Sequence, residues 1–84
     1  MFKFDKMEEL VIGGKYQHYK GGLYKLICQA KLEDTLEDVI IYQALYHSEE
    51  FGKEAFWVRK KDNFFENVNL NKKWVPRFRY IKTE

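Results

Sequence analysis

One stretch of the chain, residues 23–33 with the sequence LYKLICQAKLE, alternates its side chains with a period of two. The even positions read Tyr, Leu, Cys, Ala and Leu, whereas the odd positions from residue 25 read Lys, Ile, Gln, Lys and Glu. Because successive side chains of a strand point to opposite faces, this pattern predicts a long, half-buried β-strand. We expect Leu26, Cys28, Ala30 and Leu32 to face the core.

The segments on either side predict further strands joined by short turns. Residues 15–20 predict a short strand, and Gly21-Gly22 supplies the positive φ angles of a tight hairpin turn. Residues 33–38 are a polar turn. Residues 38–47 predict a second long strand with apolar or aromatic residues on both faces, which is typical of a central strand covered on each side.

The middle of the chain predicts shorter elements. A polar loop around Gly52 covers residues 48–54 and leads into a short strand at residues 55–59. Residues 60–66 show no period of two, and they predict one helical turn that places a Phe in the core.

The two ends of the chain complete this outline. Residues 67–73 contain three Asn and predict a turn region, and residues 74–81 predict the last strand. Pro76 cannot donate a ladder hydrogen bond, so it belongs at a sheet edge or a bulge. Residues 1–12 form an N-terminal extension that fits either an added strand, through Phe2 and Phe4, or a short helix over residues 5–12.

Five short strands without room for crossover helices predict an antiparallel meander. A twisted sheet of this size closes most readily into a small barrel, since closure removes the exposed edges. We therefore expect a mostly β protein in which residues 13–84 form a single domain, a five-stranded antiparallel SH3-like barrel with one short helical turn. An OB-like barrel is the alternative.

Length and composition exclude several classes of protein. Eighty-four residues make one small domain, and 45% hydrophobic with 33% charged residues is the composition of a globular chain. The single cysteine, Cys28, excludes an intramolecular disulfide, and no apolar run approaches the length of a membrane span. The first residues also lack the apolar core of a signal peptide. We expect a soluble, cytoplasmic protein.

The inventory of catalytic and metal-binding side chains is poor. Cys28 is expected to face inward, where a thiol behaves as a small hydrophobe, and the single serine, Ser48, is badly placed for activation by the adjacent His47. His18 and His47 are the only histidines, and with one cysteine they do not make a zinc site. We expect no catalytic residues, no metal and no cofactor.

Two predicted strands alternate apolar residues with arginines. The apolar set is expected to line the core: Phe56, Val58, Phe78 and Tyr80. The other set is then left on the surface: Trp57, Arg59, Arg77 and Arg79. A surface Trp among arginines is typical of interface hot spots and of base-stacking platforms. In the alternative, Trp57 packs under the N-terminal segment and the arginines pair with the acidic turns.

The tyrosines form a second candidate surface. Tyr42 and Tyr46 share a strand face, and further tyrosines flank the Gly21-Gly22 turn. Tyrosines that line a groove hold extended peptides in SH3-like barrels, whereas cross-strand aromatic pairing is the structural alternative. The candidate ligand-binding residues taken from both surfaces are His18, Tyr19, Tyr42, Trp57, Arg59 and Arg77.

Charge is distributed unevenly, although the formal net charge is only +2. Residues 31–54 carry two Lys against seven acidic residues, whereas residues 55–84 carry eight basic residues against three acidic ones. A dipolar surface of this kind orients a charged partner even when the net charge is small.

Four ordered motifs give the chain a family resemblance. They are GKYQHYKGGLY at residues 14–24, IYQALY at residues 41–46, WVR at residues 57–59 and VPRF at residues 75–78. Together they span about residues 13–81, and the chain resembles the DUF1653 family of small bacterial domains of unknown function. The resemblance implies an SH3-like β fold and a cytoplasmic, bacterial setting, and it implies no activity. Family members often have Pro after the WVR motif, where this chain has Lys60-Lys61.

These observations favour a non-catalytic binding module that presents an aromatic and arginine surface to a peptide, protein or nucleic-acid partner. The alternative is a self-associating scaffold, a homodimer in which the apolar N-terminal segment adds to a sheet edge of a second copy. No membrane partner is expected, and an enzyme is the least favoured class because of the poor nucleophile inventory.

Overall fold

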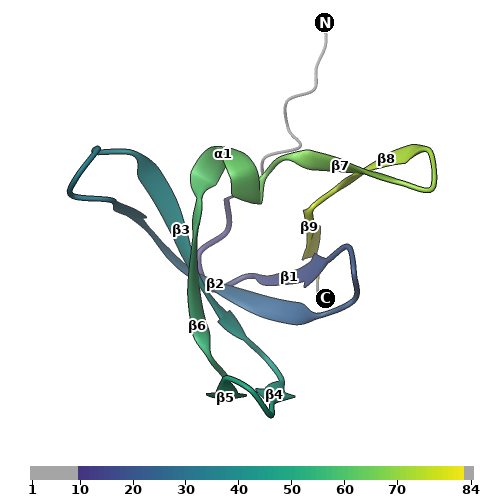
Figure 1. Ribbon diagram of the computed structural model, residues 1–84, viewed down its shortest axis with the longest axis horizontal. Coiled ribbons are helices and arrows are strands. Elements are labelled where there is room, and N and C mark those ends of the chain that lie inside the picture. Colours follow the sequence, from purple (N-terminus) through teal and green to yellow (C-terminus); the bar gives the residue numbers. More distant parts are fainter. Residues whose placement is uncertain (1–9, 83–84) are drawn as a thin grey trace, which may run out of the picture.

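The computed structural model describes residues 10–82, and its centre is a five-stranded antiparallel sheet (Figure 1). The sheet has the order β6-β3-β2-β1-β9, and every neighbouring pair is antiparallel. The strands are β1 (Lys15–His18), β2 (Leu23–Lys31), β3 (Asp38–Ala44), β6 (Phe56–Lys60) and β9 (Phe78–Ile81). The mostly β, five-stranded antiparallel architecture expected from the sequence is confirmed.

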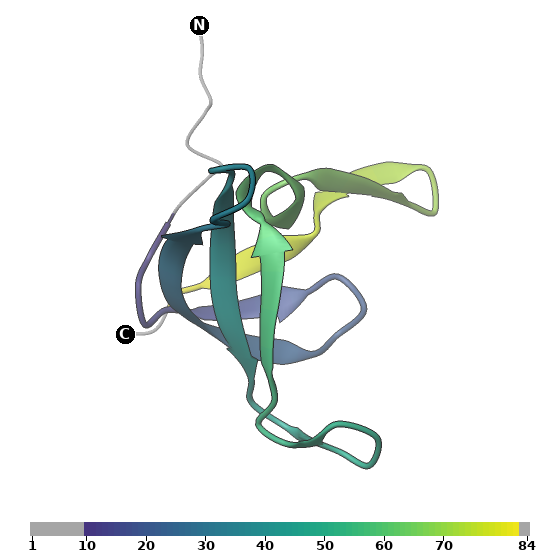
Figure 2. The same cartoon turned by 60° about the vertical axis from the view of Figure 1, so that its left-hand side comes forward.

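Two small hairpins and one helical turn complete the structure. One hairpin pairs β4 (His47–Ser48) with β5 (Gly52–Lys53), and the other pairs β7 (Asn67–Leu70) with β8 (Lys73–Pro76). The helical turn α1 (Lys61–Phe64) follows β6 directly. Seen from the side, the β7–β8, β1–β2 and β4–β5 hairpins all project toward the same side of the molecule (Figure 2).

The sheet curls strongly but is not closed into a barrel. Its two edge strands are β6 and β9, and no hydrogen-bonded pairing joins them within residues 10–82. The helical turn lies on the open side, where the Phe64 ring stacks on Phe78 of β9 with ring centroids 4.1 Å apart. Side chains rather than a strand ladder therefore bridge the two edges, and the predicted barrel closure is not confirmed.

The core is small and largely aromatic. It consists of Tyr16, Leu26, Ile40, Tyr42, Phe64 and Phe78. The predicted helical turn that places a Phe in the core is confirmed, since the Phe64 side chain is completely buried. The rings meet mainly edge to face, an arrangement that is favourable because the positive ring edge faces the negative face of its neighbour.

The prediction that Leu26, Cys28 and Ala30 share one face is wrong. The β2–β3 register shifts between Leu26 and Cys28, so that Leu26 lies opposite Tyr42 while Cys28 lies opposite Ile41. A β-bulge adds one residue to one strand, and every later side chain then changes face. Leu32, expected inward as well, follows the end of β2 and is exposed.

The prediction that Phe56 and Val58 line the core is also wrong, because the two faces of β6 are exchanged as well. Val58 lies opposite Ile41, whereas Trp57 lies opposite the core residue Tyr42. Residues directly opposite each other share a face, so Trp57 and Arg59 lie on the concave, core-facing side. Phe56 and Val58 are on the outer side, where they are 62% and 59% exposed.

The C-terminal region contains more regular structure than the sequence suggests. Residues 67–73, expected to be a turn region, include β7, and the predicted last strand is divided at Arg77 into β8 and β9. Pro76 ends β8 in the two-stranded hairpin, a position compatible with its missing N–H. The two predictions made for residues 1–9 lie outside the described residues, and residues 10–12 form no helix.

Candidate functional site: an aromatic and arginine face

Aromatic rings continue from the core to the surface at one end of the concave face. Tyr24 packs edge to face against the buried Tyr42 and against Tyr46, and the hydroxyls of Tyr24 and Tyr46 are hydrogen-bonded. Burial and this hydrogen bond raise the pKa of the Tyr24 phenol. Trp57 lies on the same concave side as Tyr42 and contacts the exposed ring of Phe51 from the β4–β5 hairpin. We call Tyr24, Tyr46, Phe51 and Trp57 the aromatic mouth.

Phe78 connects this mouth to the cationic part of the site. Its ring contacts Tyr24 and Tyr42 edge to face, and His18 packs against it with centroids 4.9 Å apart. The Arg59 guanidinium lies 5.8 Å from the centroid of the same ring, within the range of a cation–π interaction. Three of the residues singled out from the sequence, His18, Tyr42 and Arg59, therefore meet around one buried side chain.

Asn63 of α1 holds two arginines next to each other. Arg59 donates to the Asn63 side-chain oxygen and, from Nε, to the Tyr42 hydroxyl at 3.4 Å. Arg77 donates from Nε to the Asn63 backbone carbonyl at 3.0 Å and pairs with Glu66 at 2.9 Å. Arg77 is thus neutralised by a carboxylate. Arg59 has no carboxylate partner within residues 10–82.

His18 is held as a neutral ring. Its Nδ1 accepts a hydrogen bond from the Lys20 backbone N–H at 3.1 Å, so the proton of the neutral ring sits on Nε2. Partial burial lowers the pKa of His18, and the positive charges of Arg59, Lys20 and Arg77 lower it further. The Nε2–H has no acceptor among the residues the structure describes and remains able to donate to a ligand.

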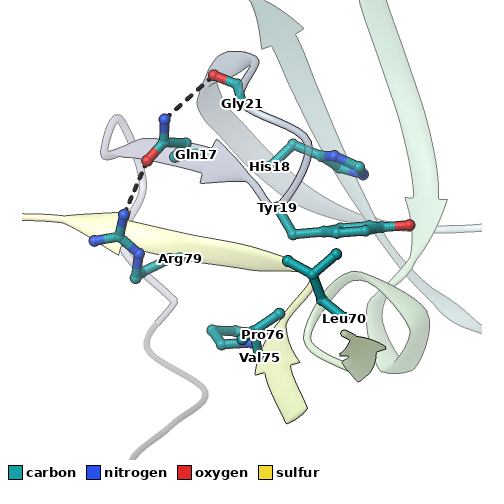
Figure 3. A pocket seen from close by; sticks show the side chains of 8 residues that line it. All are labelled: Gln17, His18, Tyr19, Gly21, Leu70, Val75, Pro76 and Arg79. Atoms are coloured by element: carbon teal, nitrogen blue, oxygen red, sulfur yellow. Dashed lines mark hydrogen bonds between the residues drawn. The ribbon is translucent and has the colours of Figure 1, made fainter. Parts of the chain in front are cut away.

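A cleft lies beside His18, between the β1–β2 turn and the β7–β8 hairpin (Figure 3). It has a volume of about 300 Å³, at the lower end of the range typical of ligand pockets. The Tyr19 ring lies between His18 and Leu70, and Val75 and Pro76 add apolar surface. On the opposite side Arg79 donates to the Gln17 side-chain oxygen at 2.9 Å. We call this the hairpin cleft.

The predicted site residues do not all have the exposure that a ligand contact needs. His18 and Tyr19 line the hairpin cleft and Trp57 belongs to the mouth, whereas Tyr42 is a core residue and Arg77 is occupied by Glu66. Tyr46 and the tyrosines that flank the Gly21-Gly22 turn belong to a candidate surface predicted from the sequence, but sequence reasoning missed Phe51 in the mouth and Gln17 and Leu70 in the cleft. The alternation of residues 78–81 does place Arg79 on the face of β9 that points away from Phe78 and the core. Only the tertiary structure brings Leu70 beside Tyr19.

Other kinds of site receive little support. The Ser48 hydroxyl accepts hydrogen bonds from the backbone N–H groups of Glu50 and Phe51 at 3.2 and 3.1 Å, so it stabilises its own hairpin loop. Within the described ranges, no group of three or more His, Cys, Asp or Glu side chains could hold a metal ion. None of the helices formed by residues 10–82 is long and apolar enough to cross a membrane.

Comparisons with other proteins agree with the sequence motifs. A crystal structure of a DUF1653 protein from Bordetella bronchiseptica superimposes with a TM-score of 0.75 and 29% identity, over 89% of this chain and 91% of that chain. No match was found among curated proteins. The model of the family described as protein of unknown function (DUF1653) matches residues 14–80. The chain therefore belongs to the DUF1653 family.

Proposed function

We propose that this protein is a non-catalytic binding module, an SH3-like curled sheet that holds a partner at the open end of its concave face. The observation that carries the proposal is the half-buried Arg59 guanidinium, which lies over Phe78 without a carboxylate partner within residues 10–82. A half-buried cation on the same concave face as exposed Trp and Tyr rings is typical of the residues that dominate binding energy at interfaces. The partner proposed for the concave face is a peptide, a protein or a nucleic acid.

The side chains at the site support binding rather than catalysis. The concave face offers the aromatic surface of the mouth, the Arg59 guanidinium and the His18 imidazole, and these groups donate hydrogen bonds and stack. The Ser48 hydroxyl is engaged in its own loop, and Cys28 lies beyond the bulge on the other face of β2. The cytoplasmic, bacterial setting inferred from the sequence is part of this proposal.

Strand β6 offers a matched test, because its two faces carry comparable side chains. We expect Trp57→Ala to weaken binding by about tenfold or more, since truncation of an interface Trp typically costs above 1–2 kcal/mol. Phe56→Ala, on the outer face, is the control. Amide NMR spectra of the labelled protein are recorded with short single-stranded DNA, short RNA and extended decapeptides. Shifts at Trp57, Tyr46 and His18 support the proposal, and shifts confined to Phe56 and Val58 contradict it.

A self-associating scaffold is the second candidate, and the free edge of β6 favours it. The Ala44 N–H donates to the Ala55 carbonyl at 2.8 Å, and the alternation of an antiparallel ladder then points the backbone N–H and C=O of Val58 away from β3. An edge with exposed Phe56 and Val58 side chains is a template for pairing with another copy. Light scattering at high concentration tests it: a dimer that Val58→Lys dissociates supports it, and a monomer removes it.

A further inference from the structure

The charged residues of the protein are separated into two spatial halves. Residues 10–32 and 67–82 carry nine Lys and Arg and no Asp or Glu, whereas residues 33–66 carry nine Asp and Glu against four Lys and Arg. The acid-free segments form β1, β2, β7, β8 and β9, and β2, β1 and β9 are neighbours in the sheet. Within residues 10–82, the side of the sheet formed by β2, β1 and β9 and the β7–β8 hairpin therefore carry basic side chains and no acidic ones, a property that the net charge of +2 conceals.

The hairpin cleft lies inside this positive half. Lys20 follows Tyr19 in the β1–β2 turn, Lys72 and Lys73 stand at the tip of the β7–β8 hairpin, and Arg79 lines the cleft. Within residues 10–82 none of these four cations pairs with a carboxylate; the ion pairs of the acid-free segments are those of Lys31 and Arg77. Cations that lack internal partners around an apolar cleft are complementary to a polyanion.

Aromatic surface accompanies the charge. Trp74 is 69% exposed, the highest value among the large apolar residues of the described range 10–82, and it directly follows Lys72-Lys73. On the neighbouring turn, Lys20 Nζ lies 5.8 Å from the centroid of the Tyr19 ring, which itself borders the cleft. Exposed rings flanked by cations are how proteins bind single-stranded nucleic acids: bases stack on the rings while the cations contact phosphates.

Lys72, at the tip of the β7–β8 hairpin, has a left-handed backbone conformation that is unfavourable for lysine. Asn71 and Lys72 have φ values of 52° and 68°, as a two-residue hairpin turn with both central residues left-handed requires. Asn tolerates that region, but the second position is normally Gly, and a lysine there is strained. The Asn69 side-chain oxygen accepts a hydrogen bond from the Lys72 backbone N–H at 3.1 Å and stabilises this turn, so a positive charge is held at the tip of the hairpin.

From the separation of charge, the cleft and the exposed rings, we propose that the hairpin cleft and the β7–β8 tip bind single-stranded nucleic acid. Lys20, Lys72, Lys73 and Arg79 contact phosphates, and one base enters the cleft beside Tyr19. The strand then passes over the β7–β8 tip, so that another base stacks on Trp74, which lies on the hairpin face opposite Leu70 and Val75. The inference goes beyond the proposed function: it assigns a second site, on the hairpins, to single-stranded nucleic acid and leaves the aromatic mouth as the site of the partner proposed above.

The test is fluorescence anisotropy of a labelled 12-nucleotide RNA, and of the matching DNA, with the whole protein. We expect the logarithm of the affinity to fall with the logarithm of salt concentration with a slope of about −2 to −3, because each neutralised phosphate of a single strand contributes about −0.7. Lys72→Gln with Lys73→Gln should weaken binding at least tenfold. The matched control, Lys60→Gln with Lys61→Gln, removes two adjacent lysines from the acidic half and should change the affinity less than twofold.

Two further variants separate stacking and charge from folding. Trp74→Ala should weaken binding by about five- to a hundredfold, since each stacked base contributes about 1–3 kcal/mol. Lys72→Gly relieves the left-handed strain, so it should raise the melting temperature while weakening binding; a merely structural lysine would show the first effect alone. Thermal melting by circular dichroism confirms that each variant is folded.

Several outcomes would overturn the inference. It fails if both lysine pairs weaken binding equally, if Trp74→Ala has no effect, or if a duplex of the same sequence binds as tightly as the single strand. It also fails if poly-glutamate binds and the oligonucleotides do not, a result that assigns the positive half to acidic proteins. In the amide spectra, oligonucleotide shifts at Trp57 and Tyr46 but not at the hairpins would contradict this inference alone, whereas oligonucleotide shifts at the hairpins with no probe shifting Trp57 would contradict the proposed function alone.

Discussion

Strands β6 and β9 form the two edges of the same sheet, and both alternate aromatic or apolar residues with arginine. They differ in which of these side chains face the core. On β9, Phe78 and Tyr80 face the core and Arg79 faces solvent, as the alternation predicts. On β6, the polar member of the pattern, Arg59, faces inward with Trp57. Alternation therefore identifies which side chains share a face, but it does not say which face is buried.

The reason lies in what each strand contacts. The inward residue of β9 meets an apolar interior, and Phe78 contacts Phe64, Tyr42 and Tyr24. The inward Arg59 instead finds hydrogen-bond acceptors on Tyr42 and on Asn63 of α1. A polar side chain is tolerated on a core-facing position when its donors are satisfied, and the helical turn supplies that partner.

The largest expected effect concerns the inward ring of β9. Phe78→Ala should destabilise the fold by about 3–5 kcal/mol, because Phe78 is 4% exposed and its removal leaves a cavity among aromatic rings. On β6, Val58→Ala should change stability by less than about 0.5 kcal/mol. Urea unfolding measures both variants, and Phe78→Leu serves if Phe78→Ala does not fold. A loss above about 1 kcal/mol for Val58→Ala would show that Val58 is a core residue after all.

A smaller effect distinguishes the two arginines. Arg59→Gln should cost about 1.5–3 kcal/mol, since it removes charge-assisted hydrogen bonds to Tyr42 and Asn63 and the contact with Phe78. Arg79→Gln, which loses one exposed contact with Gln17, should cost less than about 0.5 kcal/mol. Urea unfolding compares the two variants, and equal losses of stability would contradict the inward position of Arg59 and the outward position of Arg79.

The smallest effect is the pH dependence contributed by His18, which packs on Phe78 beside β9. Its pKa is lowered in the folded state by burial and then by Arg59, Lys20 and Arg77, so the unfolded chain binds the proton more readily. The stabilising contribution is complete above the ordinary pKa of 6.5 and declines as the pH falls below it. Melting temperatures of wild type and His18→Gln between pH 7.5 and 5 should converge at low pH. His47→Gln, on the exposed β4, is the control, and a matching change there would contradict the assignment.

The site was predictable in part. The motif around residues 14–24 and the arginine strands pointed to His18, Tyr19, Trp57 and Arg59. The structure places His18 and Arg59 around Phe78, Tyr19 in the hairpin cleft and Trp57 in the aromatic mouth. Phe51 and Leu70 could not be found from the sequence, because each meets the site through the placement of a loop or hairpin. The sequence-based charge count also divided the chain at residue 54, whereas the acid-free half combines both ends of the described chain.

The amino-acid sequence by itself determined the class of fold, the strands β1, β2, β3 and β6, the turn at Gly21 and the single helical turn that buries Phe64, because these follow from local periodicity and backbone preference. The tertiary structure alone decided which face of each strand is buried. A bulge between Leu26 and Cys28 changes the face of the rest of β2, and the register against β3 turns Trp57 and Arg59 inward. Register depends on contacts between distant residues, and a shift of one residue exchanges the two faces of a strand without changing its pattern.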